Sequence, residues 1–241
     1  MHTYFISDLH LSPERPQTIQ AFLHFLQGDA LGAERLYILG DLFEFWIGDD
    51  AAKLLGAETV LKAMKGVSKH VDCFFIAGNR DFLVRDGFSA HSGFNILPDE
   101  SIIDLYGTRT LILHGDSLCT DDVAHQEFRT SMMTNLAFCE AFLKLEIPQR
   151  IEKAKLARME SHQHKSSISM EIMDVTQSAV LEAFEAHKVQ QMIHGHTHRQ
   201  NTHRYTTKAG DSVRYVLGDW HTSSSIMRAD KNGLAIHNAQ I

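Results

Sequence analysis

The sequence predicts an α/β fold in which short buried strands alternate with helices around one core. Two observations predict this class. Apolar runs of three to five residues recur along the chain, and segments with apolar residues at helical spacing separate the early runs. Each run ends in a cluster of Gly, Asp, Asn or His. Strands that alternate with helices imply a sheet covered on both faces, with ligands expected beyond the carboxyl ends of the strands.

Five apolar runs are the predicted strands. In chain order they are residues Thr3–Ile6, Leu36–Leu39, Cys73–Ala77, Thr110–Leu113 and Gln191–Ile193. Helices are predicted at residues 16–27 and at about residues 51–69. Apolar residues repeat at helical spacing in both segments, and Pro16 suits a first helical turn. From Arg204 the chain returns to strands, and Lys231-Asn232-Gly233 predicts a hairpin turn.

The segment from about Thr120 to Asp174 breaks this alternation. It contains no strand-like run and predicts several helices, whose apolar residues include Phe128, Met132, Met133, Leu136, Phe138, Phe142, Leu143 and Leu145. Between residues 129 and 165 there are seven Lys or Arg against four Glu. We therefore expect one domain of residues 1–241 that carries a helical insertion at about residues 120–174, with a basic and partly apolar face.

Composition argues against several classes of protein. Hydrophobic residues make up 44% of the 241 residues and charged residues 22%, which is ordinary for a folded domain. The net charge of −7 argues against nucleic acid as a partner. The three cysteines are widely spaced and predict reduced thiols in a cytoplasmic protein. Neither a signal peptide nor an apolar stretch of about 18 residues is present, so we expect any membrane contact to be peripheral.

Five polar motifs follow the predicted strands and carry the predicted chemistry. In order they are Asp8-Leu9-His10, Gly40-Asp41-Leu42, Gly78-Asn79-Arg80-Asp81, His114-Gly115-Asp116 and His194-Gly195-His196-Thr197-His198. Strand ends converge on one crevice, so these distant motifs are expected to be neighbours. Their carboxylate, imidazole and carboxamide groups, without a thiolate, suit manganese, iron or zinc. The motifs together therefore predict a metal site.

The spacing within the motifs favours two ions. Residues two apart in an extended segment point the same way, so Asp8 and His10 can bind together, as can His196 and His198. Two metals about 4 Å apart usually share a bridging carboxylate, and Asp41 is the natural bridge. A single Gly-Asp or Gly-Asn pair after a strand is most often a turn. The prediction therefore depends on all five motifs occurring in this order.

This ordered set resembles the calcineurin-like metallophosphoesterase superfamily, whose fold is a sandwich of two mixed sheets flanked by helices. The resemblance implies two metal ions that activate a water molecule for in-line attack on phosphorus. One ion would be held by Asp8, His10, Asp41 and His198, and the other by Asp41, Asn79, His114 and His196. The resemblance also implies catalytic roles for Asn79, His114 and His196.

Arg80 departs from the superfamily pattern, which commonly has His after the Gly-Asn pair. Arginine stays protonated and cannot act as a general acid, but its planar fork binds phosphate oxygens and stabilises transition-state charge. That exchange suits a phosphate leaving group, whose second pKa is about 6, better than a basic alkoxide. Arg80 is thus a predicted catalytic residue for cleavage of a pyrophosphate. The alternative is that Arg80 only pairs with Asp81 or another acid.

Longer strings resemble the family of UDP-2,3-diacylglucosamine diphosphatases of lipid A biosynthesis. They are Ile6–Leu11, Tyr37–Glu44, Trp46–Asp50, Gly78–Leu83, His114–Asp116, Leu118–Asp122, Ile172–Val175 and Ile193–Arg199, and the resemblance covers essentially the whole chain. It implies hydrolysis of UDP-2,3-diacylglucosamine at the α-phosphorus, which gives UMP and 2,3-diacylglucosamine 1-phosphate. It also implies two Mn²⁺ per chain and a helical lid that holds the acyl chains. The predicted insertion would be that lid.

The same resemblance implies a peripheral enzyme on the cytoplasmic face of the inner membrane of a Gram-negative bacterium, and we expect a monomer. The basic insertion could then meet anionic headgroups. The substrate-binding residues that it implies are Asn79, Arg80, Asp122, Ser161, Lys165, Ile168 and His196. Ile168 stands where the family has a lysine, and Lys165 one turn earlier could replace it. Phe128, Phe138 and Phe142 could line an acyl chamber, or only pack the insertion onto the body.

Two other functions stay open at this point. The first is a nucleotide pyrophosphatase or general phosphodiesterase of the same superfamily, without an acyl pocket. The apolar insertion argues against it, because a soluble nucleotide needs no such cover. The second is a binding scaffold that has lost catalysis, and the intact set of Asp and His ligands argues against that.

Overall fold

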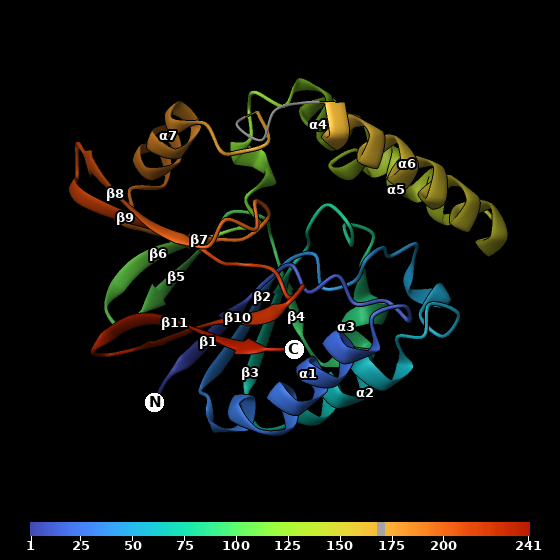
Figure 1. Ribbon diagram of the computed structural model, residues 1–241, viewed down its shortest axis with the longest axis horizontal. Coiled ribbons are helices and arrows are strands. Elements are labelled where there is room, and N and C mark those ends of the chain that lie inside the picture. Colours follow the sequence, from blue (N-terminus) through green and yellow to red (C-terminus); the bar gives the residue numbers. More distant parts are fainter. Residues whose placement is uncertain (168–171) are drawn as a thin grey trace.

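Two mixed sheets form the centre of the molecule (Figure 1). The computed structural model describes residues 1–167 and 172–241, without the side chains of residues 160, 162 and 164–167. In the six-stranded sheet, β1 (Thr3–Ile6), β2 (Arg35–Leu39), β3 (Asp72–Ile76) and β4 (Asn95–Leu97) are parallel, and β10 (Ser223–Asp230) and β11 (Gly233–Gln240) extend it antiparallel beyond β1.

The second sheet has five strands in the order β5-β6-β7-β9-β8. They are β5 (Ser101–Leu105), β6 (Thr108–Ile112), β7 (Gln191–His194), β9 (Gly210–Val216) and β8 (Asn201–Thr207). Strands β6, β7 and β9 are parallel, and antiparallel partners flank them on both sides. The parallel strands of both sheets therefore bring their carboxyl ends to one edge of the sandwich.

Helices cover both outer faces, and three apolar clusters hold the layers together. The helices α1 (Pro16–Gln27), α2 (Glu58–Val67) and α3 (Asp86–Ser92) lie together beside the six-stranded sheet, and α7 (Gln177–His187) lies against the other sheet (Figure 1). Between the sheets, strand residues such as Phe5, Ile112 and Ile193 are fully buried. Burial of apolar surface on both faces of each sheet is the main stabilisation of such a layered fold. The predicted sandwich of two mixed sheets flanked by helices is confirmed.

A set of helices projects from one end of this sandwich (Figure 1). It comprises α4 (Val123–Phe128), the π-helical turn η4 (Arg129–Met133), α5 (Leu136–Leu143) and α6 (Ile147–Ser167), and we call α4 to α6 the helical insertion. Several apolar side chains of the helices α5 and α6 are exposed: Leu136, Leu156 and Met159. In the described part of the chain, no helix is long and apolar enough to cross a membrane.

One predicted helix differs from the structure, and four elements were not predicted. Residues 51–69 were expected to form one helix, and this is wrong: turns occupy residues 52–56 and α2 begins only at Glu58. The reason is Gly56, whose φ of +71° interrupts the helical path. Strands β4 and β5 and helices α3 and α7 were not predicted. The hairpin is confirmed, because Asp230 pairs with Gly233 across Lys231 and Asn232.

Candidate metal centre

The loops after β1 and β2 run side by side and place the first two motifs together. Main-chain N–H groups of Asp8 and His10 donate to the carbonyls of Gly40 at 3.1 Å and Asp41 at 3.0 Å. Five of the eight non-glycine residues with positive φ in the described chain are predicted ligands: Asp8, His10, Asp41, His196 and His198. Such conformations cost energy and persist where the surrounding structure enforces them, which is typical of functional sites.

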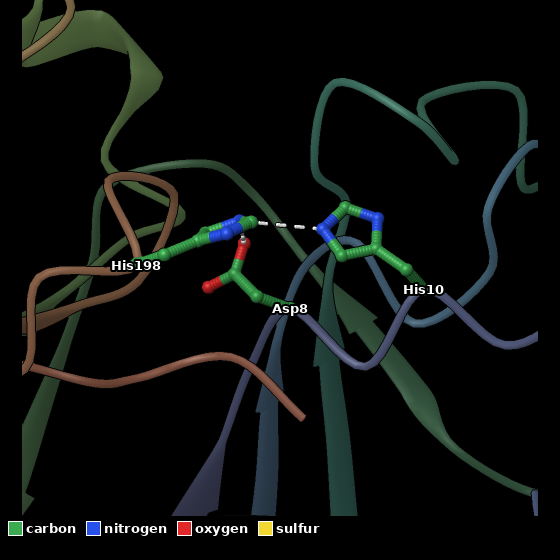
Figure 2. Close-up of side chains that lie close together, drawn as sticks. All are labelled: Asp8, His10 and His198. Carbon is green, nitrogen blue, oxygen red and sulfur yellow. Dashed lines mark hydrogen bonds and ion pairs between the residues drawn. The ribbon is translucent and has the colours of Figure 1, made fainter. Parts of the chain in front are cut away.

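Asp8, His10 and His198 form one ligand group. Figure 2 shows their side chains pointing toward one another. The Nε2 atom of His198 lies 3.3 Å from Oδ1 of Asp8 and 3.3 Å from Nε2 of His10. Oδ1 of Asp8 is buried and accepts no hydrogen bond within the described residues. A buried carboxylate oxygen without a donor is costly, and a cation bound between these three groups would satisfy it.

Asn79, His114 and His196 form a second group on the other side of the centre. Oδ1 of Asn79 lies 3.1 Å from Nε2 of His114 and 3.0 Å from Nδ1 of His196. The Nδ1–H of His114 donates to the carbonyl of Leu39 at 2.8 Å, so its Nε2 presents a lone pair in the neutral ring. Lone pairs that face one another in this way fit a shared cation.

Asp41 lies between the two groups. Its Oδ2 is 3.8 Å from Nε2 of His10 and its Oδ1 is 3.6 Å from Nε2 of His114, while only 2% of the residue is exposed. One oxygen thus faces each group, so Asp41 could offer a ligand atom to a cation on either side. Ligand atoms of Asp8, Asp41 and His114 also lie within 4.8 Å of one another. The residues present therefore fit two divalent cations that share Asp41.

The carboxylates dominate the electrostatics of the centre. Burial alone would lower the pKa of His114, but the charges of Asp41, Asp8 and Asp116 outweigh it and raise the pKa to about 9. Burial opposes protonation of His198 in the same way, yet Asp8 and Asp219 raise its pKa to about 10. Imidazoles bind metals in the neutral form, so divalent cations would replace these protons as the counter-charge of the aspartates.

Asp81 holds the loops of the centre in place. Its fully buried carboxylate accepts hydrogen bonds from the N–H groups of Gly78, Asp41, Leu42 and Phe43, at 2.8 to 3.4 Å. These four bonds occupy Asp81, so Asp81 is not the partner of Arg80. The guanidinium of Arg80 lies 4.0 Å from Oε1 of Glu44 instead, so Arg80 does pair with another acid, as the alternative also allowed.

Asp219 is a site residue that the motifs did not reveal. Its Oδ2 lies 3.0 Å from Nδ1 of His198 and fixes the ring so that Nε2 faces Asp8. Gly218 and Asp219 follow the end of β9, as Gly40 and Asp41 follow β2. A Gly-Asp pair after a strand was therefore present as a signal. It was missed because no strand had been predicted at β9 specifically.

The helical insertion borders this centre through α4 and α6. The rings of His125 and His196 lie 5.2 Å apart, and Phe128 meets Phe82 edge to face at 6.0 Å. From α6, Nε of Arg158 lies 3.2 Å from Oε1 of Glu44, beside Arg80. Phe138 and Phe142 pack instead against the core of the body. For those two residues the packing alternative holds.

The predicted substrate-binding residues lie in three places: at the centre, at α4 and α6 of the insertion, and outside the described part of the chain. Asn79, Arg80 and His196 lie at the centre itself. Asp122 is buried and caps α4, because its Oδ1 accepts the N–H of His125 at 3.0 Å. Ser161 is half-buried in α6. Lys165 lies in the last turn of α6 with its side chain outside the described part, and Ile168 lies outside the described residues.

Known proteins resemble this chain over nearly its full length. A sequence profile of the Calcineurin-like phosphoesterase family matches residues 1–200. The UDP-2,3-diacylglucosamine hydrolase of Enterobacter sp. (strain 638) is 45% identical over 236 residues, which cover 98% of each protein. The protein of that name from Escherichia coli O157:H7 (strain EC4115 / EHEC) is 47% identical over 229 residues, 95% of each.

Among solved structures, a dimetal phosphatase from Danio rerio aligns over 100% of this chain and 96% of that one. Its TM-score is 0.50 at 13% identity, so this likeness concerns the fold alone. The ordered ligand loops, the profile match and the near full-length relatives lead to one assignment. The chain belongs to the calcineurin-like phosphoesterase family and, within it, to the family of UDP-2,3-diacylglucosamine hydrolases.

Proposed function

We propose that this chain hydrolyses the pyrophosphate bond of UDP-2,3-diacylglucosamine at the α-phosphorus and releases UMP and 2,3-diacylglucosamine 1-phosphate, a step of lipid A biosynthesis. The observation that carries the proposal is the gathering of the six other predicted ligands in two groups on either side of Asp41, in a chain 45–47% identical to hydrolases of that name. A relative that had lost catalysis would be expected to have lost part of this set.

The chain's own residues supply the binding, orientation and charge that the reaction needs. Two Mn²⁺ ions, our proposed cofactors, would polarise the phosphate and supply an activated water when bound. Asp41 and the two ligand groups on either side of it would provide the metal-binding atoms. Asn79 and His196 face the same space as His114, and the N–H of Arg80 donates to Oδ1 of Asp41 at 2.8 Å. Arg80 is thus fixed beside the centre through its main chain.

The side chain of Arg80 favours a pyrophosphate substrate. In the described contacts, the closest carboxylate to its guanidinium is that of Glu44, at the long distance of 4.0 Å, so the guanidinium can turn to the phosphate oxygens of a substrate. A guanidinium stabilises the negative charge that develops on a leaving phosphate without giving up a proton. The leaving 1-phosphate of the acylated sugar needs no general acid at neutral pH. Arg80 therefore performs the task that the substrate chemistry demands.

The helical insertion is the proposed lid for the acyl chains, within one domain of residues 1–241. It borders the centre through His125 and Arg158, and its apolar side chains are unusually exposed: Val123 is 64% exposed, Leu136 73% and Met159 60%. Exposed apolar residues in a basic setting suit an anionic lipid surface. We accordingly propose a monomer that acts peripherally on the cytoplasmic face of the inner membrane of a Gram-negative bacterium.

Substrate comparison tests this proposal. The purified protein, stripped with a chelator and supplied with Mn²⁺, is offered UDP-2,3-diacylglucosamine and, separately, UDP-glucosamine. We expect UMP from the acylated substrate at a rate at least about a hundredfold higher. Similar rates on both would instead indicate a nucleotide pyrophosphatase. If neither substrate is cleaved, and Asp41→Asn matches the parent, the chain is not a hydrolase of this class.

A metal series tests the cofactor. The chelated protein receives Mn²⁺, Zn²⁺ or Mg²⁺ in turn, and bound metal is counted by elemental analysis. We expect two Mn²⁺ per chain together with full activity. The mixed nitrogen and oxygen ligands disfavour Mg²⁺, which prefers oxygen and retained water. Full activity with Mg²⁺ alone would contradict the manganese assignment.

A further inference from the structure

The helices α5 and α6 of the insertion both contact one loop of the body, residues 46–50. Gly48 in this loop has a φ of +125°, and a Cβ atom there would collide with Nη1 of Arg150 from α6 and lie 2.9 Å from Cδ2 of Leu143 from α5. Both helices therefore meet the body where only glycine leaves room. Leu143 also packs against the core cluster that contains Trp46.

Arg150 makes the polar contacts of this junction. It is 3% exposed, although it belongs to a mostly exposed helix. Its Nη1 donates to the carbonyl of Ile47 at 2.7 Å and to Oδ1 of Asp50 at 2.8 Å, and its Nη2 donates to Oδ2 of Asp50 at 2.5 Å. A guanidinium with a two-pronged carboxylate partner is a geometrically specific contact; here Arg150 is buried, whereas 59% of the Asp50 side chain is exposed.

The other end of the same loop contacts the segment that contains Arg80. The main-chain N–H of Trp46 donates to the carbonyl of Arg80 at 2.9 Å. The Trp46 indole donates to Oδ1 of Asp49 at 2.9 Å, and Oδ2 of Asp49 accepts the N–H of Phe88 in α3. Residues 46–50 therefore connect Arg150 of the insertion to the main chain of Arg80, the residue that we place on the phosphate.

We propose that Arg150 is a positioning residue, which fixes the lid to the loop of residues 46–50, whose Trp46 hydrogen-bonds to the main chain of Arg80, and so sets the position of the acyl-binding surface relative to the phosphate site. Its own side chain touches neither the ligand groups nor Arg80 in the described contacts. The inference rests on the proposed function, since it concerns how an acylated substrate is held. Loss of Arg150 should weaken binding of the acyl part and leave the chemical step largely intact.

Kinetics with the acylated UDP-sugar give the first test. Arg150→Met is compared with Lys62→Met, which removes an exposed basic residue of α2, outside the insertion. We expect KM to rise at least about tenfold in Arg150→Met with kcat within about threefold, and neither to change in Lys62→Met. Arg150→Lys keeps the charge without the fork and should recover part of the loss. An unchanged KM in Arg150→Met, or an equal rise in the lysine variant, would overturn the proposal.

Tryptophan fluorescence gives a second test that needs no turnover. The protein has two tryptophans, and Trp220 is fully buried beside α1, so a change in quenching by acrylamide reports on Trp46. We expect greater quenching in Arg150→Met and, to a smaller extent, in the milder variant Asp50→Asn. Equal quenching in both variants and the parent would overturn the proposal that Arg150 fixes the insertion to residues 46–50. If the parent released no UMP, the proposed function would fail. The quenching measurement would still show whether Arg150 fixes the insertion to residues 46–50.

Discussion

The metal centre and the helical insertion differ in how their residues are held. At the centre, Asp8, Asp41 and His114 are at most 2% exposed, and backbone hydrogen bonds join the loops that carry them. On the insertion, Arg158 has 53% of its side chain exposed and Leu136 is 73% exposed. The insertion contacts the body through apolar side chains of α5, such as Phe138, and through a few polar contacts, such as Arg150 with Asp50.

From this difference we expect the metal centre to control the chemical step and the insertion to control the choice of substrate. Ligand atoms must stay within a fraction of an ångström of a productive geometry, and buried strand ends provide such rigidity. A surface for flexible acyl chains needs apolar area more than fixed geometry. Changes at the centre should therefore affect kcat and metal content, whereas changes on the insertion should affect KM. The predictions below test this division, beginning with the largest effect.

Asp41→Asn should give the largest loss. The carboxamide keeps the shape but cannot bridge two ions as a carboxylate does, so we expect kcat to fall by about a thousandfold or more. Bound metal, measured by elemental analysis, should fall below two ions per chain. A variant that retained two ions and about a tenth of parental kcat would show that Asp41 is not the bridge.

Arg80→Met should lower kcat without removing metal. The guanidinium is proposed to stabilise charge on the leaving phosphate, and loss of one such group typically costs roughly a hundredfold. Metal content should match the parent, because none of the ligand atoms is changed. Arg80→Lys serves as the matched control, with a smaller loss, because it keeps the charge but not the fork. A fall in metal content would place Arg80 in the metal site instead.

Asp219→Asn should weaken one metal site only. Asp219 orients His198 through a 3.0 Å contact, and loss of such a supporting carboxylate typically costs about 10- to 100-fold in metal affinity. Titration with Mn²⁺ should then show one weakened and one parental binding step. Saturating Mn²⁺ should restore most of the activity. Equal weakening of both steps would contradict the separation of the two ligand groups.

The centre could be predicted from the sequence because its residues follow recognisable strands. Asp8, Asp41 and His114 each come directly after a short apolar run, and parallel pairing of β1 with β2 and of β6 with β7 brings such ends to one edge. Helix α1 was predicted with its observed bounds, since Pro16 and the apolar repeat mark it locally.

The parts that could not be predicted depend on contacts between distant residues. Arg150 reads as one more basic residue of an exposed helix, and only the fold brings it to Asp50, 100 positions earlier. The task of Asp81 is equally hidden, because its partners Leu42 and Phe43 belong to another loop. Strand β4 has only three residues, which is too short for a periodic pattern.

Leu136→Ser on the insertion should give the smallest effect on the folded protein. Leu136 is 73% exposed, so we expect the free energy of unfolding to change by less than about 0.5 kcal/mol. Substrate presented in vesicles that contain anionic lipid should nevertheless show a KM about threefold higher, because less apolar surface enters the lipid. An unchanged KM on vesicles would contradict membrane contact at this residue.

Phe138→Ala on the same helix α5 is the matched control. Its side chain packs against the core of the body, so its removal should lower the free energy of unfolding by about 1–3 kcal/mol. If the insertion is divided into a packing face and a lipid face, the two variants should show opposite patterns: lost stability in Phe138→Ala and raised vesicle KM in Leu136→Ser. If both variants lost stability and neither raised the vesicle KM, α5 would have no separate lipid face, because burial on the body would then explain both residues.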